Sequence, residues 1–171
     1  EEMRSRGFTV EWLGTQAGIE SRLVPANNIV LHFIPVKGVR GKGLRQKLSA
    51  PINILSSLLS AVKVLRSVRP ALVVGLGGFV AGPGGLGAKI LGLPLVIHEQ
   101  NAVPGTTNTL LAKIASKVLT AFPSKLVSGE CIGNPVRSAI ERIAPPSERM
   151  DISSKSIKLL ILGGSRGAQA I

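Results

Sequence analysis

The sequence predicts an α/β fold, a Rossmann-like doubly wound sheet of parallel strands. Short apolar runs rich in Val, Leu and Ile alternate with longer segments of helical periodicity, and glycine-rich turns follow three of these runs. Of the 171 residues, 44% are hydrophobic and 18% are charged, a composition that can bury a sizeable core. Together these observations favour repeated strand and helix units that build a parallel sheet.

Each apolar run is expected to form a strand, and each longer segment between two runs a helix. The six expected strands are Thr9–Leu13, Val30–Pro35, Ala71–Leu76, Leu95–His98, Val118–Ala121 and Lys158–Leu162. The four expected helices are Ile19–Pro25, Pro51–Val68, Gly82–Leu91 and Thr106–Ala115.

The segment Ala144–Ser154 is polar, aperiodic and contains two prolines, as linkers often are. We therefore expect an N-terminal domain over residues 1–143, a linker over 144–156 and the start of a second domain over 157–171. Residues Glu1–Arg6 resemble the last turn of a helix, and the final strand opens a unit that cannot bury its faces alone. A first βα unit and most of a second domain are thus expected outside this chain.

The net charge of +12 is concentrated in one part of the sequence. Ten Lys and Arg residues lie between Arg22 and Lys89, and no acidic residue lies between Glu20 and Glu99. This pattern predicts an anionic partner. Aromatic residues make up only 3%, with no Tyr, which disfavours single-stranded nucleic acid and leaves a phosphate-bearing small molecule or an anionic bilayer.

Other composition features exclude several classes. One cysteine, Cys131, and two histidines, His32 and His98, give no basis for a disulfide or a metal site, so no metal or cofactor is expected. The N-terminus does not resemble a signal peptide, and no apolar run reaches the roughly 18 residues of a membrane span. A cytosolic chain is therefore expected.

The segment Gly75–Gly85 holds six glycines in eleven residues, between an expected strand and a helix. Backbone N–H groups at such a turn can converge on a phosphate, while a tight packed turn is the simpler alternative. The dinucleotide fingerprint is not complete, because Val80 stands where a third Gly or Ala belongs.

Polar side chains follow the next strand, at His98-Glu99-Gln100-Asn101. Open α/β sheets bind ligands at the carboxyl ends of their strands, although loop capping explains the same residues equally well. Further along, Pro135 fixes a turn that would present Arg137 to an anion, although a plain surface turn explains these residues equally well, and Gly163–Gly167 would form a second glycine loop.

The expected helix Pro51–Val68 has more apolar residues than one core-facing stripe needs, and cations near its end. One alternative is a core helix with a solvated basic end. The other is a peripheral membrane face. Its residues would be Leu55, Leu58, Leu59, Val62, Lys63 and Arg66.

These motifs, in order and spacing, resemble those of glycosyltransferase family 28, in particular its peptidoglycan enzymes. They include Trp12–Thr15, Gly38–Gly43, Gly75–Gly85, His98–Asn101, Gly133–Arg137 and Gly163–Ala168. The resemblance implies a two-domain GT-B enzyme that inverts configuration. It would move N-acetylglucosamine from UDP-GlcNAc to undecaprenyl-pyrophosphoryl-MurNAc-pentapeptide (lipid I), forming lipid II on the cytoplasmic face of the bacterial membrane.

The resemblance also assigns roles by position. Asn101, Arg137 and Ser165 would contact UDP-GlcNAc, His98 and Glu99 would support catalysis, and the proposed general base would precede Glu1. Phe79 stands where some members have Tyr. The lipid-linked pyrophosphate would lie at Gly75, Gly77, Gly78, Phe79, Gly82, Gly84 and Gly85, the cleft would include Asn108 and Asn134, and the second-domain loop would use Gly163, Gly164 and Gly167.

Two other functions remain open from the residues alone. A nicotinamide-dependent Rossmann enzyme would use Gly75, Gly77 and Glu99, although Val80 and Pro83 disfavour it. A basic nucleic-acid-binding module would use the charge of +12.

Overall fold

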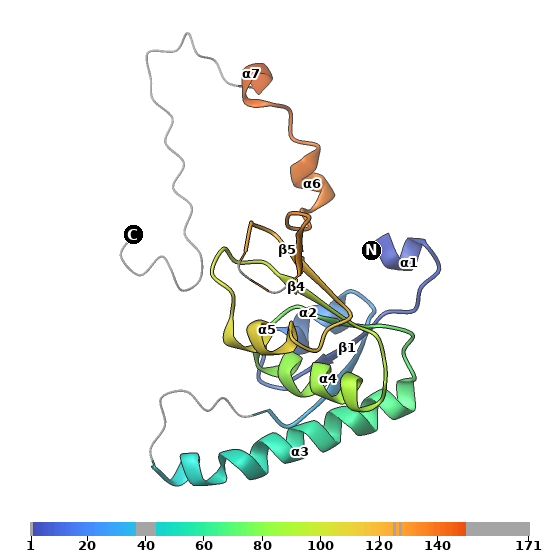
Figure 1. Ribbon diagram of the computed structural model, residues 1–171. Helices are drawn as coiled ribbons and strands as arrows, with labels where there is room; N and C mark the ends of the chain where they lie inside the picture. The colour runs from blue at the N-terminus through green and yellow to red at the C-terminus, as the bar shows by residue number, and fades with distance from the viewer. Residues whose placement is uncertain (1, 37–43, 125, 127, 150–171) are drawn as a thin grey trace. The chain divides into compact units, whose positions relative to one another are not determined.

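Figure 1 shows the computed structural model of the chain, which describes residues 2–36, 44–124, 126 and 128–149, with the backbone alone for 44–50. All its strand pairs are parallel, and helices follow most strands, which confirms the expected α/β class. One sheet pairs β1 with β2, and the other has the order β3-β4-β5-β6. The strands are β1 (Glu11–Gly14), β2 (Val30–Phe33), β3 (Val73–Gly75), β4 (Leu95–Glu99), β5 (Lys117–Thr120) and β6 (Gly129–Cys131).

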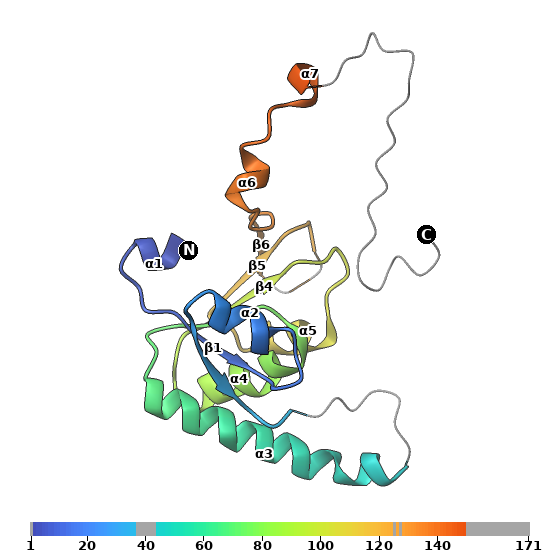
Figure 2. The same cartoon turned by 180° about the vertical axis from the view of Figure 1, so that it is seen from behind.

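The helices are of very different lengths, and the two longest lie side by side. Figures 1 and 2 show α4 between α3 and the strands, and α4 contacts β1, β3 and β4. The helices are α1 (Glu2–Ser5), α2 (Glu20–Ala26), α3 (Leu44–Val68), α4 (Gly78–Ile90), α5 (Thr106–Leu111), α6 (Ser138–Glu141) and α7 (Pro146–Arg149).

The main core lies where α3, α4 and α5 meet β4. Strand β4 is central in the larger sheet, and four of its five residues are buried. Ile97 is fully buried at its centre, and a Cβ on Gly75 of β3 would lie 2.7 Å from Cδ1 of Ile97. The buried cluster consists of Leu65, Ala88, Leu95, Ile97 and Leu111.

The structure differs from the expected elements at several boundaries. Helix α3 begins at Leu44, before Pro51, and α4 begins at Gly78 instead of Gly82. Strand β6 was not expected, because its three residues are exposed and carry no apolar run. The expected strand Lys158–Leu162 lies outside the described residues.

The chain divides into two compact units, Glu1–Asn134 and Pro135–Ile171. In the second unit, α6 and α7 have no buried residues. Helix α7 falls inside the segment expected to be an aperiodic linker, because Pro146 suits the first turn of a helix, where its missing N–H is not needed. The expected domain bounds at 143 and 157 stay a prediction.

Candidate functional site

Two positive-φ glycines turn the chain from β3 into α4. Only Leu76 and Gly77 separate the two elements. Gly77 has φ 83° and ψ −170°, and Gly78 has φ 79°, a backbone region that residues with a side chain rarely adopt. A Cβ on Gly77 would also lie 3.2 Å from Nδ2 of Asn108. This sharp turn starts α4 four residues earlier than expected and brings its N-terminus to the carboxyl end of the sheet.

The later glycines of the stretch lie within α4, where two of them serve packing. A Cβ on Gly84 would lie 3.2 Å from Cδ2 of Leu13, and one on Gly85 would lie 2.8 Å from Cδ1 of Leu111. Both glycines are buried. Of the residues expected at an anion, Gly75, Gly77 and Gly78 lie at the sheet edge, Phe79 is exposed in the first turn of α4, and Gly82, Gly84 and Gly85 follow inside the helix.

Glu99 is the centre of a hydrogen-bond network at the end of β4, with only 1% of its surface exposed. Its Oε1 accepts hydrogen bonds from the backbone N–H of Asn101 at 2.9 Å and from Nδ2 of Asn101 at 3.0 Å. Its Oε2 accepts from the backbone N–H of Gly105 at 3.0 Å and from Nδ2 of Asn108 at 2.8 Å. Both carboxylate oxygens are therefore engaged twice.

The environment of Glu99 favours its ionised form. Burial alone opposes ionisation and raises the pKa of Glu99. The hydrogen bonds from Asn101, Asn108 and Gly105 outweigh that effect and hold the pKa of Glu99 below the ordinary value for a glutamate. At neutral pH the side chain is an acceptor only.

His98 and Gln100 join β4 to the loops beside it. Nε2 of His98 lies 3.0 Å from the carbonyl oxygen of Gly133, so this nitrogen donates its proton there. Nε2 of Gln100 donates to the carbonyl oxygen of Leu76 at 2.9 Å, and Nδ2 of Asn134 donates to the carbonyl oxygen of Gln100 at 3.2 Å. The turn before α4, the end of β4 and residues 133–134 thus form one connected edge.

Asn108 was expected to line a cleft, but it is only 1% exposed in α5, beneath Gly77. It donates to Glu99 and, at 3.3 Å, to the carbonyl oxygen of His98. Among the described residues, three buried atoms have no hydrogen-bond partner: Nδ1 of His98, Oδ1 of Asn108 and Oγ1 of Thr120.

Sequence reasoning gave no role to Gly105 or to Gly133, the first residue of the motif Gly133–Arg137, because both act through backbone atoms. The N–H of Gly105 serves Glu99, and the carbonyl of Gly133, a residue with φ 84°, serves His98. Gly105 follows Pro104 and Gly133 precedes Asn134, and such pairs are typical of turns, so the sequence could have indicated that the backbone turns there. Nowhere in the described ranges do three or more His, Cys, Asp or Glu side chains gather where a metal ion could be held.

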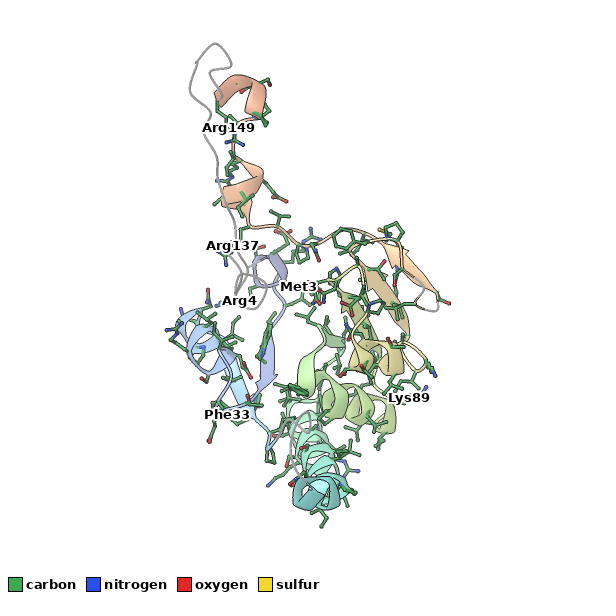
Figure 3. The ribbon with its side chains drawn as sticks, turned by 90° about the vertical axis from the view of Figure 1, so that its left-hand side faces the viewer. Met3, Arg4, Phe33, Lys89, Arg137 and Arg149 are labelled. Carbon is green, nitrogen blue, oxygen red and sulfur yellow. The ribbon has the colours of Figure 1, made fainter. Side chains whose placement is uncertain are left out.

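The remaining expected site residues are not all placed by the structure. Asn101 is exposed at the sheet edge. Arg137 is exposed as the N-cap of α6 in the second compact unit (labelled in Figure 3). Ser165, Gly163, Gly164 and Gly167 lie outside the described residues.

One side of α3 is buried, and α3 packs closely against α4 at Gly87. Ser57, Ala61 and Leu65 repeat every four residues and are all buried. Gly87 of α4 allows close approach, because a Cβ there would lie 3.4 Å from Cγ2 of Val62 and 3.6 Å from its backbone nitrogen. The hydroxyl of Ser57 also donates to the carbonyl oxygen of Pro35.

The opposite side of α3 leaves large apolar side chains in solvent. Ile52 is 72% exposed, Leu55 55% and Leu59 61%. Lys63 and Arg66 are exposed and fall on the same side by their helical spacing. Figure 3 views α3 nearly along its axis and shows side chains extending away from α4. We call Ile52, Leu55, Leu59, Lys63 and Arg66 the outer stripe; of the other residues expected in this face, Leu58 and Val62 are half-buried.

Within α3, Pro51–Val68 has the length and composition of a membrane-crossing helix, with a mean hydropathy of 1.2 and 17% of the segment buried. The segment passes by its mean hydropathy and is not an uninterrupted apolar run, because Asn53, Lys63 and Arg66 lie within it.

Comparisons with known proteins agree with each other. Residues 1–120 match the model of the glycosyltransferase family 28 N-terminal domain. A UDP-N-acetylglucosamine--N-acetylmuramyl-(pentapeptide) pyrophosphoryl-undecaprenol N-acetylglucosamine transferase of Saccharophagus degradans is 49% identical, over 100% of this chain and 46% of the relative. The enzyme of the same name from Cellvibrio japonicus is 50% identical, over 100% of this chain and 49% of the relative.

A solved structure shows the same fold. The crystal structure of Acinetobacter baumannii MurG matches with a TM-score of 0.67 and 44% identity, over 77% of this chain and 38% of the other. The chain spans about half the length of the curated relatives it matches. The comparisons give no support to the nicotinamide or nucleic-acid alternatives. By the family model and by relatives that align over its whole length, the chain belongs to glycosyltransferase family 28.

Proposed function

We propose that this chain is the acceptor-side half of an enzyme that transfers N-acetylglucosamine from UDP-GlcNAc to lipid I, forming lipid II for peptidoglycan. The observation that carries the proposal is the sequence identity of 49% to 50%, over the whole chain, to relatives named as N-acetylglucosamine transferases of this kind. The connected edge at the carboxyl ends of β3 and β4 supports it, because this is where open α/β sheets bind ligands.

The N-terminus of α4 suits the pyrophosphate of a lipid-linked acceptor. No side chain caps this helix, so its first N–H groups remain available, and the helix dipole favours an anion there. A Cβ on Gly78 would lie in open space, so its absence leaves room for a phosphate to approach the backbone. We assign the acceptor pyrophosphate to this turn, and Asn101, Arg137 and Ser165 to the UDP-GlcNAc donor.

An inverting transfer needs a base that removes a proton from the acceptor hydroxyl. His98 and Glu99 are poorly suited to that role. His98 is 6% exposed and its unprotonated nitrogen, Nδ1, is buried, while both oxygens of Glu99 are already engaged. We therefore place the general base outside this chain and expect the isolated 171 residues to be inactive.

The test is transfer of radiolabelled N-acetylglucosamine from UDP-GlcNAc to lipid I, followed by chromatography of lipid II. The full-length protein as the cell makes it should form lipid II, and the isolated chain should not. Asn101→Ala should lower the rate at low UDP-GlcNAc, whereas Gln16→Ala, an exposed polar change outside the site, should leave it unaltered. Absence of transfer by the full-length protein would refute the proposal.

We also propose that the enzyme binds peripherally to the cytoplasmic face of the bacterial membrane through the outer stripe of α3. Its exposed apolar side chains can enter the interface while Lys63 and Arg66 meet anionic lipid, each cation contributing about 1 kcal/mol. A position on the surface fits better than a crossing helix. Ser57, Ala61 and Leu65 are packed against the domain and would have to leave it if α3 crossed the bilayer.

Flotation with anionic and with neutral vesicles tests this second proposal. The pair Leu55→Ser and Leu59→Ser should weaken binding to anionic vesicles, and Lys63→Gln with Arg66→Gln should remove its salt dependence. The control pair is Ile90→Ser and Leu110→Ser, which alters side chains that are 57% and 59% exposed on other helices. Equal binding by the stripe and control variants would count against a membrane role for α3.

A further inference from the structure

Glu99 has the features of a residue that acts through its neighbours. It is 1% exposed, and four donors occupy its two carboxylate oxygens. A ligand could therefore bond to the Glu99 carboxylate only by displacing one of these four donors. Any effect of Glu99 on a bound ligand must therefore pass through a side chain or backbone group that it holds.

Asn101 is the exposed neighbour held in this way. Its backbone N–H and its Nδ2 both donate to Oε1 of Glu99, at 2.9 and 3.0 Å. A carboxylate has no hydrogen to donate, so only the NH₂ end of an amide can face it. The amide of Asn101 thus has one favoured orientation, with Oδ1 turned away from Glu99.

The other hydrogen bonds of Glu99 fix its carboxylate, and this restricts the orientation of the Asn101 amide. Oε2 is held by the N–H of Gly105 and by Nδ2 of Asn108, which is itself buried in α5. The carboxylate cannot rotate without losing these bonds. Meanwhile, no donor within the described part of the chain is bonded to Oδ1 of Asn101.

We propose that Glu99 is a positioning residue that fixes the Asn101 amide with Oδ1 outward, so that Asn101 accepts a hydrogen bond from a hydroxyl or N–H group of the ligand. A phosphate oxygen carries no hydrogen at neutral pH and is repelled by Oδ1. Resting on the proposed function, this assigns Oδ1 of Asn101 to a hydroxyl or N–H group of the sugar or base of UDP-GlcNAc, because the pyrophosphate has no hydrogen to donate to it.

Steady-state kinetics of the full-length enzyme test the proposal. Glu99→Gln has nearly the same shape but can present either end of its amide to Asn101. It should raise KM for UDP-GlcNAc about tenfold, the effect of one lost hydrogen bond, while kcat and KM for lipid I change less than about twofold. Glu20→Gln is the matched control, since Glu20 likewise accepts hydrogen bonds from a backbone N–H and a side chain, both of Thr15, outside the site.

Combination with changes at Asn101 separates positioning from general support of the fold. In an Asn101→Ala background, Glu99→Gln should add less than about twofold to KM, because the group through which it acts is gone. In an Asn101→Asp background, Glu99→Gln should lower KM, because it removes the repulsion between two carboxylates. A purely structural role predicts equal harm in all three backgrounds.

The possible results distinguish failure of the positioning role from failure of the proposed function. Additive effects of Glu99→Gln and Asn101→Ala, or a loss confined to kcat, would overturn the positioning role while transfer by the unaltered enzyme kept the proposed function intact. An unaltered enzyme without transfer would overturn both. If Glu99→Gln does not fold, Asn101→Asp alone decides, because this exposed isosteric change should raise KM as much as Asn101→Ala, and an unchanged KM would overturn the role.

Discussion

The end of β4 and the helix α3 are stabilised in opposite ways. At β4 an apolar residue, Ile97, and a charged residue, Glu99, are both almost completely buried, with every carboxylate oxygen bonded. Helix α3 is 25 residues long, yet among its described side chains only Ser57, Ala61 and Leu65 are buried. The end of β4 is therefore held by packing and hydrogen bonds around each side chain, whereas α3 is held only along the side that carries Ser57, Ala61 and Leu65.

The difference shows that apolar composition does not identify the core. The segment Pro51–Val68 of α3 is strongly apolar, but large side chains such as Ile52 and Leu59 lie in solvent. In contrast, the polar Glu99 is buried because its donors come from the same loop and from α5. Substitutions in the two regions should therefore have very different costs.

The largest effect is expected at the centre of β4. Ile97→Ala removes a fully buried side chain that packs over Gly75 and should lower the free energy of unfolding by about 2–5 kcal/mol. Leu59→Ala, at a position 61% exposed, should cost about 0.5 kcal/mol or less. Urea unfolding of both variants measures the contrast, and equal costs would show that α3 is buried in solution.

The seam between α3 and α4 should be the next most sensitive place. Gly87→Val adds a branched side chain where even a Cβ would lie 3.3 Å from Leu65 and 3.4 Å from Val62. Overpacking of this kind costs about 1–3 kcal/mol. Thermal unfolding should detect the loss. The control is Lys89→Ala, an exposed change in the same helix. Gly92→Ala would be a poor control, because Gly92 has a positive φ that alanine rarely adopts. A neutral Gly87→Val would mean that α3 can move off α4.

Removal of the charge at Glu99 should cost about 1–2 kcal/mol at neutral pH. Since the folded pKa of Glu99 is depressed, its contribution is present above the unfolded value of about 4.5 and is lost as the pH falls through the lower folded pKa. Unfolding midpoints from pH 7 to pH 3 should therefore converge for the unaltered protein and Glu99→Gln. Parallel curves would contradict this account.

The smallest effect on stability is expected in the outer stripe. Leu55→Ser with Leu59→Ser should change the free energy of unfolding by less than about 0.5 kcal/mol per site, because both side chains are already in water. A loss of vesicle binding without a loss of stability would separate the role of this surface from that of the core. A large loss of stability would contradict the exposed position of the stripe.

The sequence predicted the strands well and the helix starts less well. Five expected strands are present within two residues of their expected starts, because their apolar runs are short and bounded by turn residues. The start of α4 was missed because the glycines at its beginning disfavour a helix locally, and packing against Leu13 and Leu111 explains only Gly84 and Gly85. Strand β6 was missed because pairing with β5, and not its composition, defines it.

For the candidate site, the sequence motifs predicted its place at the carboxyl ends of the strands but not the role of each side chain. The polar run after β4 was found from its place behind a strand. That Glu99 and Asn108 are buried depends on the return of the chain through Gly105 into α5, which residue spacing does not reveal. The same limit explains why Asn108 was expected in a cleft.

The separation of the two sheets has a consequence for local opening. No backbone hydrogen bond between described residues joins the sheet β1-β2 to the sheet β3-β4-β5-β6. Two contacts near the smaller sheet are those of Leu13 with Gly84 of α4 and of the Ser57 hydroxyl of α3 with the carbonyl oxygen of Pro35. In the 171-residue chain, the amides of β1 and β2 are therefore expected to exchange hydrogen sooner than those of β4.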